Sequence, residues 1–337
     1  MQKELKNQVK VKEKSMDFGL LIITIVLLCI GIVMVSSASS YYALTKIGNS
    51  GHFLFRQLVF AIIGVAAMLV ISKIDYRKYA RFAYLGYFLS LILMLFVLIP
   101  GVGGDIKGAN RWIDIGGNTI QPSEIMKVAL IIALSTYIVK NTKKMSKITG
   151  YVVPCIMLLV VIGVMFIQNH LSGMIIMAFV SGIVFFLSGI RIKPIYLIAI
   201  AVIGALVIYI FISAEEFRGK RLTSFFNPEA DIRGDSWQVN QSLYALGSGG
   251  IFGKGLGQSR QKYLWLPEAQ NDFIFSILGE ELGVFGSITV ITLFGIFIVR
   301  GIRIGIKSND TYAMLLSCRN NINVCISGNC KYSCCNI

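Results

Sequence analysis

Residues 266–275 read LPEAQNDFIF, and here a long polar stretch gives way to an apolar one. The polar stretch, residues 221–281, is the longest part of the chain that cannot lie within a lipid bilayer, whereas the chain before it is mostly apolar. An ionisable side chain between a polar loop and hydrocarbon is a functional candidate. We therefore predict that Asp272 is the reacting carboxylate.

The rest of the chain has the pattern of a membrane protein. It has 337 residues, of which 55% are hydrophobic, and its apolar runs approach the roughly 20 residues that cross about 30 Å of hydrocarbon as a helix. The pattern predicts an all-α, polytopic membrane helix bundle with spans near residues 18–37, 53–74, 82–99, 120–139, 151–167, 171–190, 194–213 and 273–299.

The corresponding organisation has six parts. We expect a cytoplasmic leader (1–16), seven spans (17–213), an extracellular catalytic loop (214–271), an eighth span (272–300), a cytoplasmic segment (301–317) and a tail (318–337).

The net charge of +15 raises the question of a nucleic-acid partner. With the N-terminus inside, most basic residues fall in the inner turns, and those outside are nearly balanced by acids. This asymmetry follows the positive-inside rule. The charge is therefore explained by topology, and we expect no nucleic acid. The two histidines, His52 and His170, have no metal-ligand spacing.

The motif at residues 121–127 opens the fourth predicted span. Ser123 or Gln121 can cap the helix, and Glu124 lies near the positive end of its dipole. Lys127 follows Glu124 by three residues on the same helix face, among apolar residues. We favour a structural ion pair between the two; the alternative is a polar site on a substrate path.

Cationic side chains also occur in the predicted outer loops. Arg111, beside Trp112, can bind an anionic head group, although Trp112 can also be a plain interfacial anchor. Lys254, Arg260 and Lys262 accompany six glycines between residues 247 and 257 that do not fit a phosphate-loop pattern. We interpret the glycines as a flexible or tightly turned lid whose basic residues suit a diphosphate.

Two adjacent carboxylates, Glu280 and Glu281, follow Asp272 in the last span. They lie about two helical turns, or roughly 12 Å, deeper. Since neighbouring residues point about 100° apart, both cannot share the face of Asp272. We predict a structural role for them, with one paired to Lys127.

Together these motifs resemble the SEDS family of shape, elongation, division and sporulation proteins, which includes FtsW, RodA and SpoVE. The resemblance runs from about residue 17 to 317. It rests on GANRWI (108–113), QPSE (121–124) with Lys127, RL (221–222) with FNP (226–228), QSL (241–243), the glycines at 249–257, LPEA to DFIF (266–275) and GEELG (279–283).

The resemblance implies a peptidoglycan glycosyltransferase that polymerises lipid II at the outer face of the bacterial cytoplasmic membrane. It implies Asp272 as general base and a class B penicillin-binding transpeptidase as partner, within a divisome or elongasome; an FtsW-like role is slightly favoured. It gives the predicted substrate-binding residues Arg111, Trp112, Lys127, Arg221, Gln241, Lys254, Arg260 and Lys262. No cofactor is certain, and a divalent cation such as Mg²⁺ or Mn²⁺ is compatible.

Two alternative functions stay open. A transporter of the lipid-linked precursor would use Glu124, Lys127, Glu280 and Glu281 to line a path through the membrane. A noncatalytic scaffold would hold the transpeptidase and would not need Asp272.

The chain departs from the family in two places. Residues 168–173 read QNHLSG where many members have an acidic-Pro-Asp-Leu-Gly turn, so a usual carboxylate is absent. The family has ten spans, and only eight are predicted here. Five cysteines lie between residues 318 and 335, and we expect a frameshift near Ser317 to have produced this tail.

Overall fold

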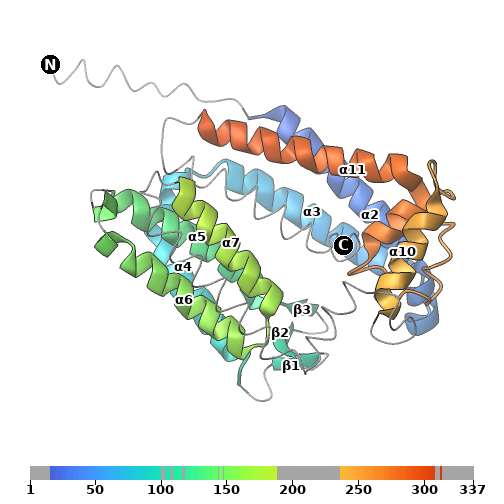
Figure 1. Ribbon diagram of the computed structural model, residues 1–337, viewed down its shortest axis with the longest axis horizontal. Helices are drawn as coiled ribbons and strands as arrows, with labels where there is room; N and C mark the ends of the chain where they lie inside the picture. Colours follow the sequence, from blue (N-terminus) through green and yellow to red (C-terminus); the bar gives the residue numbers. More distant parts are fainter. Residues whose placement is uncertain are drawn as a thin grey trace.

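The computed structural model describes residues 16–99, 103–106, 109–115, 118–142, 144–146, 148–187, 236–307 and 312. Its long helices are α2 (Phe18–Ile47), α3 (His52–Ser72), α4 (Tyr76–Phe96), α5 (Pro122–Lys140), α6 (Val152–Ile167), α7 (Leu171–Leu187), α10 (Trp237–Gly249) and α11 (Ile274–Ile306) (Figure 1). Two short 3-10 helices, η1 (Lys144–Ser146) and η2 (Ile148–Gly150), precede α6.

The predicted membrane helix bundle is confirmed. Helices α2, α3, α4, α5 and α11 are long and apolar enough to cross a membrane, while α6 and α7 are shorter apolar helices of 16 and 17 residues. All of the predicted spans fall on these helices except 194–213, which lies outside the described residues. Helix α3 contains no buried residue, as expected for a helix that faces lipid.

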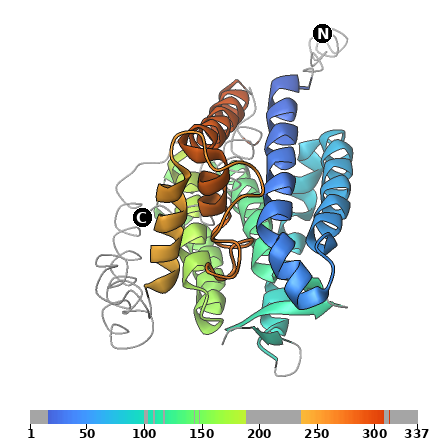
Figure 2. The same ribbon diagram turned by 90° about the vertical axis from the view of Figure 1, so that its right-hand side faces the viewer.

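The helices form two packed groups (Figures 1 and 2). Helices α4 to α7 surround a core rich in methionine, which includes Met94, Met126, Met165 and Met177. In the other group, α2 packs against both α3 and α11, and α10 packs against α11. Helix α5 is the most buried of the five long apolar helices.

An ion pair joins the ends of α2 and α11. The Asp17 carboxylate accepts from the Leu20 amide at the start of α2 and from Arg300 Nη1, both at 2.9 Å. The contact places the start of α2 beside the end of α11, so the two helices run antiparallel.

The predicted outer loop before α5 contains a small sheet. Strands β1 (Gly103–Ile106), β2 (Ala109–Ile115) and β3 (Asn118–Ile120) are antiparallel in the order β1-β2-β3. Trp112 pairs with Gly104, and Ile113 pairs with both Gly103 and Ile120. The sheet lies at the end of the α4–α7 group where α5 begins, and it fixes the backbone of Arg111 and Trp112 there (Figure 1).

Helix α11 is broken, although the sequence predicted a continuous span. Gly283 has φ 69° and ψ −167°, a region that essentially only glycine occupies. A Cβ at Gly283 would overlap the Gly253 backbone, so the break also depends on close approach by the glycine-rich segment.

That segment supplies the hydrogen bonds that the break removes. Val284 N–H donates to Gly250 O at 3.0 Å and Phe285 N–H to Ile251 O at 3.1 Å, while Lys254 N–H donates to Glu280 O at 3.0 Å. Backbone groups within a bilayer must be satisfied by protein. Residues 250–255 are therefore part of the helix bundle and not an open lid.

Candidate active site

Asp272 lies at the surface, between residues that are anchored in the core. Asp272 directly precedes Phe273, the N-cap residue of α11, and the Asp272 backbone N–H donates to Glu268 O at 3.0 Å. Leu266, Ala269 and Phe273 are buried against α2. This alternation holds an exposed carboxylate at a fixed place on the end of the α2–α11 pair where α11 begins.

The carboxylate cluster, which consists of Ser37, Lys254, Ser259, Lys262, Glu280 and Glu281, lies deeper along α11. Glu280 is 1% exposed and its Oε1 accepts from Lys254 Nζ at 2.7 Å. Its Oε2 accepts from Ser259 Oγ at 2.5 Å, and the amides of Arg260 and Gln261 donate to the same carboxylate at 3.1 and 3.3 Å.

Glu281 forms the second half of this cluster. It is fully buried, and its Oε1 accepts from Ser37 Oγ at 2.7 Å, Lys262 Nζ at 3.2 Å and the Ser259 amide at 3.3 Å. Two adjacent carboxylates thus bind one turn of the loop from residue 259 to 262. The predicted structural role of Glu280 and Glu281 agrees with these contacts.

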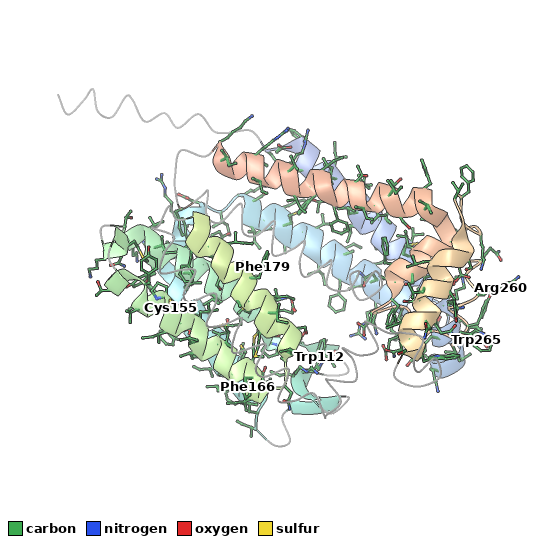
Figure 3. The ribbon with its side chains drawn as sticks, in the orientation of Figure 1. Trp112, Cys155, Phe166, Phe179, Arg260 and Trp265 are labelled. Atoms are coloured by element: carbon green, nitrogen blue, oxygen red, sulfur yellow. The ribbon has the colours of Figure 1, made fainter. Side chains whose placement is uncertain are left out.

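The basic residues of the loop point in different directions. Lys254 and Lys262 face the α11 carboxylates, whereas the Arg260 side chain is exposed. Figure 3 shows Arg260 and Trp265 at the α10 side of the molecule. Of the three, Arg260 is the cation whose side chain projects into solvent.

Two other predicted substrate-binding residues belong to the loop region. Gln241 is on α10 and is 7% exposed, because α10 packs against α11. Arg221 lies outside the described residues.

The histidine cluster, which consists of Arg111, Gln121, Glu124, Lys127 and His170, lies in the α4–α7 group. Arg111 Nη1 donates to His170 Nδ1 at 3.4 Å, and the Gln121 amide lies 3.0 Å from His170 Nε2. Lys127 Nζ is 2.7 Å from Glu124 Oε2, and the Lys127 side chain is only 6% exposed. Trp112, next to Arg111 on β2, lies at the same end of the group (Figure 3).

The imidazole of His170 is held in its neutral form. Burial, the neighbouring Arg111 guanidinium and, to a smaller extent, Lys127 together lower its pKa to about 4, while Glu124 opposes the shift. Arg111 can only donate, so Nδ1 accepts and the ring proton is on Nε2.

Two sequence predictions are wrong. Gln121 and Ser123 do not cap α5 through a side-chain hydrogen bond, because the Gln121 amide faces His170. Lys127 pairs with Glu124, as favoured, but the pairing with Glu280 or Glu281 is wrong, since those carboxylates bind Lys254 and Lys262.

Sequence reasoning also missed the contact between His170 and Arg111. The two residues are 59 positions apart, and the only signal was a polar residue in a very short turn between apolar runs.

The site residues thus fall into two groups. Arg111, Trp112, Glu124 and Lys127 belong to the α4–α7 group, and Gln241, Lys254, Arg260, Lys262 and Asp272 to the α2–α11 group. Within the described ranges, no three His, Cys, Asp or Glu side chains lie close enough together to hold a metal ion.

Known proteins resemble this chain in both sequence and fold. A sequence model of the FtsW/RodA/SpoVE family, described as "Cell cycle protein", matches residues 18–331. A protein of Trichlorobacter lovleyi named probable peptidoglycan glycosyltransferase FtsW is 39% identical over 89% of this chain and 79% of its own length. Stage V sporulation protein E of Bacillus subtilis is 39% identical over 91% of this chain and 83% of its own length.

Solved structures give the same fold. A chain from a peptidoglycan synthase complex, studied for the coordination of polymerization and crosslinking, has a TM-score of 0.77 at 21% identity and covers 96% of this chain and 88% of its own. The rod shape determining protein RodA of Thermus thermophilus has a TM-score of 0.64 at 22% identity, covering 93% of this chain and 83% of its own.

These matches define a class and then a family. The chain is an integral membrane protein with the helix-bundle fold of the peptidoglycan synthase and RodA structures. It belongs to the FtsW/RodA/SpoVE family of cell cycle proteins.

Proposed function

We propose that this protein is a peptidoglycan glycosyltransferase that polymerises lipid II into glycan strands at the outer face of the cytoplasmic membrane, during division, elongation or sporulation. The names of its relatives in Trichlorobacter lovleyi and Geobacter metallireducens support the reaction class. The observation that carries the proposal is the exposed Asp272 carboxylate, anchored at the polar end of a membrane helix.

The reaction needs one base and an electropositive surface. An acceptor sugar hydroxyl attacks the anomeric carbon of a donor, the hydroxyl proton passes to the Asp272 carboxylate, and the bond to the prenyl diphosphate breaks with its electron pair on the phosphate oxygen. The exposed Arg260 in the same loop, and Arg111 beside Trp112, are the predicted cations that stabilise the diphosphate.

The transporter function is less well supported by the contacts. A polar path for a lipid-linked sugar needs carboxylates and cations that are free to exchange partners. Glu280 and Glu281 are instead buried against the lysines and backbone amides of one loop. We therefore favour the polymerase over the transporter.

A transpeptidase partner is part of the proposal. One structural neighbour of this chain is a chain of a peptidoglycan synthase complex, and we propose a class B penicillin-binding transpeptidase as partner here.

We also propose that Mg²⁺ or Mn²⁺ enters bound to the diphosphate oxygens of the substrate, which are hard ligands for such ions.

The decisive experiment measures lipid II polymerisation by the purified protein together with a candidate transpeptidase. Asp272→Asn should lower the rate at least about 100-fold, the low end for loss of a general base. The matched control is Asp17→Asn, at the far end of α2, where asparagine still caps the helix. Full activity in Asp272→Asn would support the scaffold, and lipid II crossing vesicles without polymerisation would support the transporter.

A further inference from the structure

The Lys262 ammonium is buried and all of its donors are used. Its side chain is 4% exposed, and its Nζ donates to Gly257 O at 2.5 Å, Glu281 Oε1 at 3.2 Å and Ser37 Oγ at 3.4 Å. An ammonium has three N–H groups. Lys262 therefore joins three separate elements: its own loop, α11 and α2.

The ion pair closes a segment of chain around Asp272. Lys262 and Glu281 are 19 positions apart, and Asp272 lies near the middle of the segment between them. Both ends of this segment are held against α2 at Ser37, which binds Glu281 at 2.7 Å and accepts from Lys262 Nζ at 3.4 Å. One helical turn further along α2, the Tyr41 ring lies 4.8 Å from that of Tyr263, near the start of the segment.

Stability alone does not explain a buried ion pair at this place. Removing two charges from water is costly, and well-packed apolar residues in their place often stabilise a protein as much or more. What the ion pair adds is geometric specificity, because each carboxylate oxygen and each N–H must meet a specific partner. The best-attested use of such groups is to select one arrangement among similar ones.

We propose that the buried Lys262–Glu281 ion pair, tied to α2 through Ser37, is a positioning device that fixes the segment carrying Asp272. This inference deepens the proposed polymerase function and rests on it for its effect on catalysis. Lys262 and Glu281 act through the placement of Asp272 and do not touch the substrate. On this reading Lys262 differs from Arg260, although both were predicted to bind the diphosphate.

The test uses the full chain in detergent or nanodiscs and has two readouts. Hydrogen exchange of the amides between residues 263 and 273 measures how firmly the segment is held, and lipid II polymerisation measures kcat and KM. Lys262→Met removes the cation, and Ser37→Ala removes only the tie to α2. Ser40→Ala is the matched control, because among the described residues the Ser40 hydroxyl bonds only to Ser37 O in its own helix.

We expect exchange between residues 263 and 273 to accelerate at least tenfold in Lys262→Met and in Ser37→Ala, and kcat to fall at least tenfold with KM within about twofold. Ser40→Ala should change neither. Unaltered exchange in folded Lys262→Met or Ser37→Ala would overturn the proposal, as would a rise in KM alone. If Lys262→Met does not fold, Ser37→Ala decides. If the wild-type protein does not polymerise lipid II, the proposed function fails, and the exchange measurement still decides the positioning role.

Discussion

At the scale of single residues, the histidine cluster shows how a buried neutral ring depends on its partners. The His170 imidazole lies between a guanidinium and an amide, with Lys127 also nearby. A proton added there would place a second positive charge beside Arg111 without an exposed route to solvent. The contacts of the cluster therefore favour the neutral form of His170.

This state has a consequence for stability that depends on pH. The pKa of His170 is about 4 in the folded protein and near 6.5 in the unfolded chain, so between these values only the unfolded chain binds the proton. Stability should fall as pH drops from 6.5 to 4, by up to about 3 kcal/mol. Melting temperatures at pH 7.5 and 5 should therefore differ less in His170→Asn than in wild type. His52→Asn, at the exposed start of α3, should keep the wild-type difference.

Asp272 was predicted from sequence because a carboxylate at a polar-to-apolar boundary is unusual. The contacts of Lys254 and Lys262 could not be identified in this way. In the sequence, the two lysines suit a diphosphate ligand as well as they suit a carboxylate partner. Only the fold brings Lys254 within 2.7 Å of Glu280 and Lys262 within 3.2 Å of Glu281. Short-range pairs such as Glu124 and Lys127 could be predicted from sequence, because helix geometry alone brings residues three positions apart together.

At the scale of elements, helix boundaries followed from hydropathy, but breaks and loop structure did not. The break at Gly283 falls within a segment that was predicted to be one continuous span, and its cause is the backbone of a segment some 30 residues earlier. Helix α10 was read as part of a loop because its polar residues, such as Asn240 and Gln241, are buried against another helix. The sheet at 103–120 is likewise a product of backbone pairing in a glycine-rich stretch.

The break in α11 requires glycine at position 283, and this requirement can be tested. Alanine there would have φ near 69° and a Cβ in the Gly253 backbone, so Gly283→Ala should destabilise the protein by at least about 2 kcal/mol. Gly295→Ala, in the same helix with open space around its Cβ, should be neutral or stabilise by up to about 1 kcal/mol. Thermal unfolding in detergent compares the two, and equal melting temperatures would contradict this account of the break.

At the scale of the whole molecule, the charge distribution predicts one orientation. The antiparallel α2 and α11 put Arg300, Arg303 and Lys307 at the end where the chain enters α2. Lys73, directly after α3, and Lys78, in the first turn of α4, belong to the same end. By the positive-inside rule this end is cytoplasmic, which places Asp272 outside.

Labelling in intact cells checks this orientation. In a variant without native cysteines, Arg260→Cys should react with a membrane-impermeant maleimide, and Lys78→Cys should react only after lysis. Both side chains are exposed, so a difference in labelling reports their side of the membrane. The opposite result would reverse the topology and remove Asp272 from the outer surface.

The contact between α10 and α11 limits how this protein can be altered. A side chain at Gly249 would enter the Gly279 backbone, and one at Gly253 would enter that of Glu281. Surface loops usually accept epitope tags and added residues, and a stretch with so many glycines would be a common choice for them. Here the stretch is a spacer of fixed length, so a reporter inserted between residues 249 and 255 would separate the two halves of α11 from the residues that join them.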